Sequence, residues 1–199
     1  MRILRSADYR RMPWKNGGGE TREIAVSPPG ATLDTLDWRV SLASVAQDGP
    51  FSVFKGVQRT LCVIRGAGIQ LQAGDRAPAD LFVTSAPYWF DGEATTHARL
   101  INGPIEDLNV MSRRGRFLHE VRRLALTDTI LLDTSASLLI VYCQSGNVLC
   151  AHADVSGELQ SDDCVIFDAP AEDIRIIASQ PADLIIIELC RDCPTVPAS

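Results

Sequence analysis

The stretch Trp38-Arg-Val-Ser-Leu-Ala43 alternates large apolar residues with small or polar ones, and Asp48-Gly49-Pro50 follows it. A period of two places alternate side chains on opposite faces of a β-strand. Asp, Gly and Pro in succession are typical of a turn. The pattern therefore predicts a strand that is followed by a turn.

Most other apolar segments are equally short and are bounded by Gly, Pro, Asn or Asp, which is typical of an all-β protein. A short helical turn is expected near Ser6–Arg11, and the stretch Arg116–Arg123 fits either a turn or a strand. Regularly spaced strands without intervening helices favour a sandwich or a barrel. The expected strands are Arg59–Ile64, Ile69–Gln72, Asp80–Thr84, Thr96–Ile101, Leu108–Met111, Leu138–Tyr142, Val148–Ala151, Cys164–Phe167, Ile174–Ala178 and Leu184–Leu189.

A faint internal repeat suggests that one β-unit occurs twice. Cys62-Val-Ile-Arg-Gly66 resembles Tyr142-Cys-Gln-Ser-Gly146, and the segment leading to Asp107 is echoed by the segment leading to Asp183. Two copies in a chain of this length predict a pair of small jelly rolls. We expect a first half, residues 1–123, that carries the site, and a second half, residues 124–199, that is structural.

The two halves differ where they align. Asp107 and Asn109 share one face of a predicted strand, whereas the matching stretch 183–187 is apolar beyond its Asp. Arg59 aligns with Leu139. Polar groups on an inner face need partners, from the core or from a ligand. We therefore expect the pocket in the first half.

A glycine-rich cluster, Pro13 to Ala25, contains Trp14-Lys-Asn16 followed by three consecutive glycines. Such glycines mark a bulge or a close backbone approach, or they form a mobile connector. No Gly-Lys-Ser/Thr follows them, so the cluster is not a P-loop. An indole, a cation and an amide beside a permissive loop suit a small polar ligand.

Two arginines have both an ordinary and a functional interpretation. Arg39 and Arg59 either point into water or face a pocket, and water is the commoner outcome for a single arginine. If Lys15, Arg39 and Arg59 converge, they form a carboxylate site, because guanidinium groups bind carboxylates through two hydrogen bonds.

The charge balance bears on the class of partner. The 199 residues include 19 Lys and Arg against 25 Asp and Glu, a net charge of −6. This argues against nucleic acids and anionic membranes as partners. Residues 1–123 carry a net +4 and residues 124–199 a net −10. The basic half suits a small anionic metabolite.

The chain shows no apolar run long enough to span a membrane and no signal-peptide pattern, so a cytoplasmic location is expected. Its cysteines should then be reduced. Cys62, Cys143, Cys150 and Cys164 lie in or beside apolar runs and are expected to be buried. The C-x-x-C pair Cys190 and Cys193 reads as part of a plain C-terminal tail.

Metal and covalent chemistry receive little support. The three histidines, His97, His119 and His152, are never paired at ligand spacing, so neither a metal nor a cofactor is expected. No Gly-x-Ser-x-Gly motif is present. Glu23 and Asp107 remain available as an acid or base, which leaves enzyme activity open, although binding is favoured.

Several motifs resemble the signature of the HutD/Ves family and appear in the family's order over about the first 115 residues. They are Trp14-Lys-Asn-Gly-Gly-Gly-Glu-Thr-Arg-Glu-Ile-Ala25, Trp38–Ala43, Gly49-Pro-Phe-Ser52 leading to Arg59, Phe90-Asp-Gly92 and Gly103-Pro-Ile-Glu-Asp107-Leu-Asn-Val-Met111. The resemblance implies a bicupin, with two jelly-roll β-barrel halves in one chain, often as a homodimer.

The resemblance also implies two branches of function. One is associated with histidine utilisation and is proposed to bind N-formylglutamate and restrain expression of the pathway. The other is linked to stress or cold response without a settled activity. The ligand-binding residues carried over by motif are Trp14, Lys15, Asn16, Thr21, Glu23, Arg39, Ser41, Phe51, Arg59, Asp107 and Asn109.

Three hypotheses follow, in decreasing order of support. The first is a non-catalytic protein that binds and senses a small carboxylic acid. The second is an enzyme that acts on a small polar metabolite. The third is an interaction protein whose glycine loop docks a partner.

Overall fold

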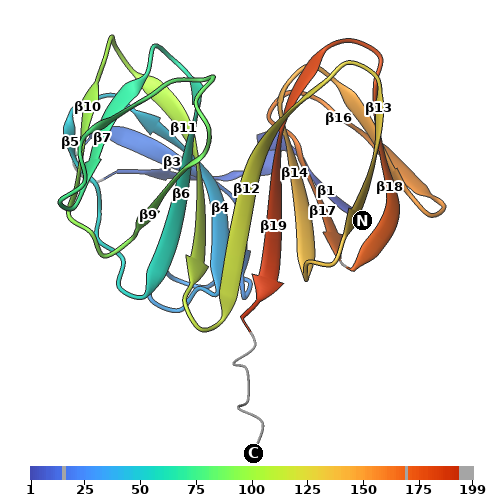
Figure 1. The fold of residues 1–199 in the computed structure, drawn as a ribbon, viewed down its shortest axis with the longest axis horizontal. Coiled ribbons are helices and arrows are strands. Elements are labelled where there is room, and N and C mark those ends of the chain that lie inside the picture. The colour runs from blue at the N-terminus through green and yellow to red at the C-terminus, as the bar shows by residue number, and fades with distance from the viewer. Residues whose placement is uncertain (15–16, 169, 193–199) are drawn as a thin grey trace, which may run out of the picture. The chain divides into compact units, whose positions relative to one another are not determined.

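The computed structural model describes residues 1–14, 17–168 and 170–192. These residues form antiparallel β-strands and a short 3-10 helix, η1 (Ser6–Asp8) (Figure 1). The predicted all-β class is therefore confirmed.

The chain divides into two compact units. The first unit comprises residues 10–118 together with Asp192, and the second comprises residues 1–9 and 119–191. The boundary expected after residue 123 lies within strand β12 (Phe117–Leu126). The second unit is thus discontinuous in sequence, because the first nine residues belong to it.

The first unit is built from two antiparallel sheets. The six-stranded sheet has the order β2 (Arg10–Pro13), β3 (Gly19–Ser27), β4 (Trp38–Val45), β11 (Ile105–Arg113), β6 (Val57–Arg65) and β9 (Tyr88–Asp91). The four-stranded sheet has the order β5 (Gly49–Pro50), β10 (Thr96–Leu100), β7 (Ile69–Ala73) and β8 (Ala79–Leu81).

The second unit also has two sheets. The five-stranded sheet has the order β1 (Arg2–Leu4), β17 (Cys164–Asp168), β14 (Leu138–Ser145), β19 (Ala182–Arg191) and β12. The four-stranded sheet has the order β13 (Thr129–Thr134), β18 (Ala171–Ala178), β15 (Val148–His152) and β16 (Val155–Leu159).

The two units repeat one strand order. The run β4-β11-β6-β9 corresponds to β12-β19-β14-β17, and β5-β10-β7-β8 corresponds to β13-β18-β15-β16. The internal repeat seen in the sequence therefore has a structural counterpart in the pairing of the strands.

The structure shifts one part of the sequence alignment by one residue. In the first unit Glu106 pairs with Arg65 immediately before a bulge, and in the second unit Asp183 pairs with Ser145 at the equivalent bulge. Asp183 therefore corresponds to Glu106 and not to Asp107. A one-residue slip moves a side chain to the opposite face of a sheet. The residue equivalent to Asp107 is Leu184.

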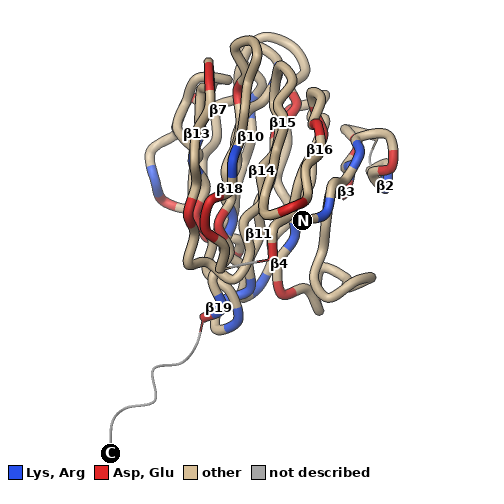
Figure 2. The backbone as a smooth tube through the Cα atoms, turned by 90° about the vertical axis from the view of Figure 1, so that its right-hand side faces the viewer, with Lys and Arg blue, Asp and Glu red and all other residues tan. Residues whose placement is uncertain are grey.

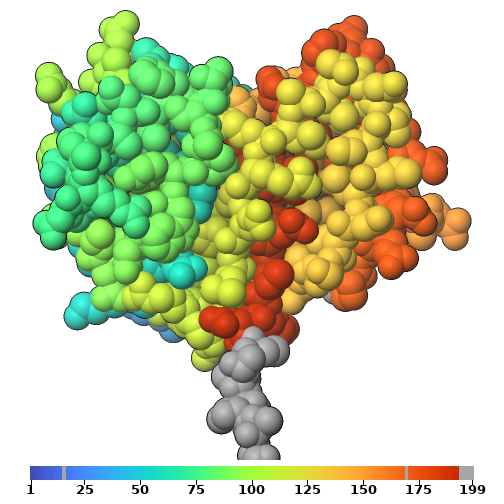
Figure 3. All heavy atoms as spheres, viewed as in Figure 1, coloured from blue at the N-terminus to red at the C-terminus, as the bar shows by residue number. Residues whose placement is uncertain are grey.

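Each unit buries apolar side chains from both of its sheets. The first core combines Leu61 and Phe90 from the larger sheet with Ile69 and Leu71 from the smaller one. In the space-filling view, side chains cover the strands drawn as ribbons in Figure 1 (Figure 3). The second core includes the thiols of Cys143 and Cys150, and Cys62 and Cys164 are also buried, as expected.

Several strands were not expected from the sequence. The stretch for which a turn and a strand were both open is a strand, β12. The expected strand Asp80–Thr84 is shorter and shifted, as β8. The unexpected strands are β1, β2, β3, β5, β9, β13 and β16. Many of these are short or poor in large apolar residues, so an apolar pattern does not reveal them.

Acidic side chains gather on the smaller sheet of the second unit. In Figure 2 the backbone is coloured red at acidic positions along β13 and β18, and the side chains of Asp133, Glu172 and Asp173 on these strands are exposed. They account for part of the negative charge of the second half. Within the described ranges, no helix is long and apolar enough to span a membrane.

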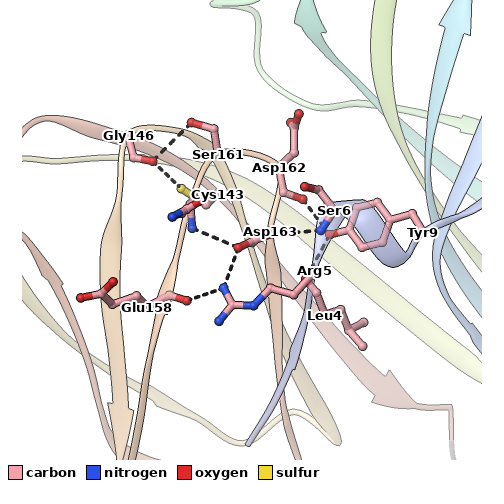
Figure 4. Close-up of polar contacts among 11 residues, drawn as sticks. Leu4, Arg5, Ser6, Tyr9, Cys143, Gly146, Glu158, Ser161, Asp162 and Asp163 are labelled. Carbon is pink, nitrogen blue, oxygen red and sulfur yellow. Dashed lines mark hydrogen bonds and ion pairs between the residues drawn. The ribbon is translucent and has the colours of Figure 1, made fainter.

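The N-terminal segment is held to the second unit by polar contacts. Arg5 Nη1 donates to Asp163 Oδ2 at 2.7 Å, and the backbone N–H of Ser6 donates to Asp163 Oδ1 at 2.9 Å (Figure 4). Tyr9 Oη donates to the carbonyl oxygen of Asp162 at 2.7 Å. Together with the pairing of β1 and β17, these bonds fix residues 1–9 in the second unit.

Candidate functional site

The first unit contains a cavity of about 580 Å³ on the inner face of its six-stranded sheet. This volume lies within the range of small-molecule sites. The cavity is lined by Met12, Pro13, Trp14, Thr21, Leu33, Arg39, Ser41, Ala43, Val45, Pro50, Phe51, Ser52, Phe54, Arg59, Asp107, Asn109 and Met111.

The registers of β4, β11 and β6 explain why polar side chains meet on this wall. Alternate residues of each strand share a face, and antiparallel pairing sets them in rows. The rows are Arg39, Met111 and Arg59; Ser41, Asn109 and Leu61; and Ala43, Asp107 and Val63. The two arginines therefore occupy one row, on either side of Met111.

Arg59 is a buried cation that is fixed by several hydrogen bonds, with 5% of its surface exposed. Its Nε and Nη2 donate to Asn109 Oδ1 at 3.3 and 3.1 Å, and Nη1 donates to the carbonyl oxygen of Ser52 at 3.4 Å. Burial lowers the pKa of Arg59 to about 10, although the charge of Asp107 opposes this shift and that of Arg39 adds to it. Arg59 therefore stays charged at neutral pH.

Three aromatic rings surround the Arg59 guanidinium. Its central carbon lies 5.4 Å from the ring centre of Phe51, 5.2 Å from that of Phe54 and 4.8 Å from that of Phe90. A guanidinium is attracted to the face of an aromatic ring. The rings thus offset part of the cost of burying this charge and limit the positions that Arg59 can take.

Arg39 has more hydrogen-bonding capacity left than Arg59. Its Nε donates to Glu23 Oε2 at 2.7 Å, in an ion pair whose two side chains are 10% and 15% exposed. Its two terminal nitrogens have no hydrogen-bond partner among the described residues, and neither does Ser41 Oγ. The Arg39 guanidinium is therefore oriented by Glu23 and keeps donors for a ligand.

Asp107 is fully buried, at 0% exposure. Its Oδ1 accepts a hydrogen bond from Asn109 Nδ2 at 3.1 Å, whereas Oδ2 has no partner in the described part of the chain. Burial raises the pKa of this carboxyl to about 7, although the hydrogen bond from Asn109 and the charge of Arg59 act in the opposite direction. The pocket thus holds a carboxyl that titrates near neutral pH.

The glycine cluster shapes one side of the pocket. Trp14 Nε1 donates to Thr21 Oγ1 at 2.8 Å, and both residues line the cavity. A Cβ atom at Gly19 would overlap the carbonyl oxygen of Ser44 and press on the Trp14 ring. Glycine is therefore required at this position by a close backbone approach, which is one of the two interpretations left open by the sequence.

The structure brings together most of the residues singled out in the sequence. Glu23 is not part of the lining but orients Arg39. Lys15 and Asn16 lie outside the described residues. The predicted residues that line the cavity are Trp14, Thr21, Arg39, Ser41, Phe51, Arg59, Asp107 and Asn109.

Sequence reasoning missed some of the lining. Ala43 and Val45 share a face with Arg39 and Ser41, so strand alternation could have found them. Leu33 and Phe54 come from connecting segments, where no periodic pattern indicates direction. Within the described ranges, no group of three His, Cys, Asp or Glu side chains is arranged to hold a metal ion. The pocket offers cations, an amide, a hydroxyl and one carboxyl.

The C-terminal cysteine pair is only partly within the described residues. Cys190 is exposed at the end of β19, and Cys193 lies outside the described range.

Comparison with solved structures supports the fold and the family. HutD from Pseudomonas fluorescens SBW25, in a formate condition, matches with a TM-score of 0.80 and 32% identity, covering 96% of this chain and 98% of that one. A conserved protein of unknown function from Pseudomonas aeruginosa PAO1 matches with a TM-score of 0.87 and 33% identity, over 95% and 98% of the two chains. Oxalate decarboxylase from Lactobacillus farciminis, at 8% identity and a TM-score of 0.68 over 94% of this chain and 85% of that one, is similar in fold alone.

Relatives found by sequence support the same family. An uncharacterized 21.2 kDa protein in the hutC 3′ region of Pseudomonas putida is 36% identical over 148 residues, covering 74% of this chain and 76% of the relative. Protein Ves from Citrobacter koseri is 42% identical over 119 residues, or 58% and 61% of the two chains. The family model described as HutD matches residues 6–186. The resemblance seen in the first motifs is thereby confirmed, and the chain belongs to the HutD family.

Proposed function

We propose that the cavity of the first unit binds a small carboxylic acid, and that the protein works by binding this acid rather than by converting it. The observation that carries the proposal is the shared row of Arg39 and Arg59 on one wall of the cavity. Guanidinium groups recognise carboxylates through parallel N–H donors. Arg39 supplies such donors, since only its Nε is engaged.

N-formylglutamate is the acid that we propose as the ligand. It has two carboxylates and one amide, which match two cations, the Asn109 amide and the Ser41 hydroxyl. Relatives carry the names HutD and hutC-region protein, so we propose a role in the regulation of histidine utilisation. The similarity to protein Ves leaves a stress-response role as the alternative branch.

We also propose a finer architecture around this site. Each unit would close as a jelly-roll β-barrel, so that the whole chain is a bicupin, and the equivalent strand orders of the two units support this. The first unit would carry the site and the second unit would support it. We propose that the protein is a cytoplasmic homodimer.

Thermal unfolding with added ligand tests the proposed function. N-formyl-L-glutamate at millimolar concentration should raise the melting temperature, because a ligand present at 100 times its Kd stabilises the folded state by about 2.7 kcal/mol. Arg39→Gln should weaken binding by about tenfold or more, since it removes a charge-assisted contact.

Arg22→Gln is the matched control. Arg22 lies on β3 and pairs with Glu106 at 2.8 Å, and it is not part of the cavity lining. This variant should bind N-formyl-L-glutamate as the native protein does. Absence of any shift with N-formyl-L-glutamate and with other acids of histidine breakdown would reject the proposal.

Enzyme activity on a small polar metabolite is the second candidate. The observation that favours it is the Asp107 carboxyl, whose pKa of about 7 suits general acid–base catalysis. Glu23 is less suited, because Arg39 occupies its carboxylate. Product analysis after incubation with candidate acids distinguishes binding from catalysis. Binding without turnover supports the binding function. Turnover that Asp107→Asn abolishes would establish an enzyme.

A further inference from the structure

The unpartnered oxygen of Asp107 points to a property of the ligand. Among the described residues, Asp107 Oδ2 is the buried side-chain polar atom without a hydrogen bond. A buried polar atom without a partner destabilises the folded state, and native proteins rarely leave one without a reason. Because Asp107 belongs to the lining of the cavity, the missing partner can be supplied by a bound molecule.

The orientation of the neighbouring groups fixes what this atom needs. Asn109 Oδ1 accepts from Arg59, so Asn109 Nδ2 is the group that faces Asp107 and donates to Oδ1. This series of hydrogen bonds, from Arg59 through Asn109 to Asp107, leaves the lone pairs of Asp107 Oδ2 unused. An ionised carboxylate accepts hydrogen bonds and donates none.

The surrounding charges exclude one type of partner. Arg59 on β6 is the cation whose charge acts on Asp107, and Glu106 on β11 is the anion that acts on it. Arg39 on β4 is already paired with Glu23 on β3. A second carboxylate placed at Asp107 would be repelled, whereas an N–H group would be attracted.

We propose that Asp107 determines specificity by accepting a hydrogen bond from an N–H group of the ligand, so that the pocket takes N-acylated or amino carboxylic acids in preference to acids without a nitrogen donor. The inference rests on the proposed function, because it assumes that an acid binds in this pocket. It adds that Asp107 recognises an N–H donor of the ligand.

A matched pair of probes tests this inference by titration calorimetry. N-formyl-L-glutamate carries the N–H group, and its ester analogue, 2-(formyloxy)pentanedioate, replaces that group by oxygen and keeps both carboxylates. The native protein should bind N-formyl-L-glutamate about 10- to 100-fold more tightly, as expected for one hydrogen bond to a charged acceptor.

Asp107→Asn should abolish or invert this preference. The introduced amide must direct its oxygen at Asn109 Nδ2, and its NH2 group then takes the place of Oδ2. A donor would thus face the N–H of the ligand, while the ester analogue loses little. Asp80→Asn is the control: Asp80 is an exposed aspartate of the same unit, it accepts a hydrogen bond from Gln70 and is not part of the cavity lining, and this variant should keep the native preference.

The pH dependence of binding gives a second readout. The affinity of the native protein for N-formyl-L-glutamate should rise about tenfold from pH 6 to pH 8, because the N–H group binds the ionised carboxyl, whose pKa is about 7. A fall over this range would mean that a protonated Asp107 donates to the ligand, and it would overturn the inference. Equal affinity for the two probes would overturn it while leaving the proposed function intact, whereas binding of neither probe would reject both.

Discussion

The six-stranded sheet of the first unit and the five-stranded sheet of the second share a strand order and a bulge, yet their inner faces differ in chemistry. Counted from the bulge, three polar residues of the first unit have apolar counterparts in the second. The pairs are Asp107 and Leu184, Asn109 and Ile186, and Arg59 and Leu139.

This difference separates the roles of the two sheets. Leu139, Leu184 and Ile186 are each 1% exposed and belong to the second core. Their polar equivalents are also buried, but they line a cavity and depend on one another for hydrogen bonds. The same arrangement of strands therefore carries apolar core residues in one unit and part of a polar cavity wall in the other.

Two buried aspartates extend the comparison. Asp163 in the second unit accepts hydrogen bonds from Arg5, Ser6 and Gln160, whereas Asp107 has Asn109 alone. Burial by itself raises both pKa values, but the bonds to Asp163 outweigh it and hold its pKa below the usual value. Asp163 is a satisfied structural carboxylate (Figure 4), and Asp107 is not.

The largest expected effect comes from placing the polar pattern in the second unit. Leu184→Asp should lower the free energy of unfolding by about 3–5 kcal/mol. The new carboxylate would be buried without the two groups that stabilise Asp107, the Asn109 amide and the Arg59 cation. Urea denaturation measures the free energy of unfolding. The uncharged variant Leu184→Asn should lose less of it than Leu184→Asp. The neighbouring exposed Asp183→Asn is the control, and a loss below about 1 kcal/mol for Leu184→Asp would contradict the comparison.

A smaller effect is expected from the titration of Asp107. Its pKa is raised in the folded protein, to about 7 from 3.8, so its contribution to stability is full at low pH and declines as the pH rises from about 4 through 7. Relative to Asp107→Asn, native stability should fall by about 2–3 kcal/mol between pH 5 and pH 8. Urea denaturation of both proteins at several pH values measures this; parallel curves would show that Asp107 does not titrate in this range.

The smallest effect is expected at Asp163, with the opposite sign. Because the pKa of Asp163 is lowered in the folded protein, its contribution to stability is present above about pH 4. This contribution is lost as the pH falls through the pKa of the folded state. Asp163→Asn should therefore cost about 1–2 kcal/mol at pH 7 and less at pH 3. A cost that does not change with pH would contradict the contrast with Asp107. Glu158→Gln is the control for the loss of a nearby charge, because Glu158 is exposed and, among the described residues, contacts Arg5 only through its backbone carbonyl oxygen.

Sequence patterns predicted strands in which apolar residues alternate with small or polar ones. Although the structure buries both faces of each strand, Trp38–Val45 and the strand that carries Asp107 and Asn109 were recognisable by this alternation. Strand β3 was not, since Gly19–Ser27 is polar and mostly half-buried. The register of the repeat was misplaced by one residue because Asp107 was matched to Asp183 by residue type, whereas the bulge that the two units share makes Glu106 the counterpart of Asp183.

The site was predictable to a similar degree. Arg59 and Asn109 stood out as polar residues because the residues aligned with them in the other half, Leu139 and Ile185, are apolar. The ring of Phe54 beneath Arg59 and the pairing of Glu23 with Arg39 depend on a connecting segment and on a bulge in β3. Neither follows from periodicity, because both are set by tertiary packing.

The discontinuity of the second unit has a consequence for synthesis on the ribosome. Ile3 pairs with Val165, so β1 has no partner until the chain has been made past β17. Nearly all of the first unit, residues 10–118, is complete by then and can fold as a domain while the chain is still growing. The pocket would thus form first, and a product that stops after the first half would carry β1 as an unpaired strand able to associate with other chains.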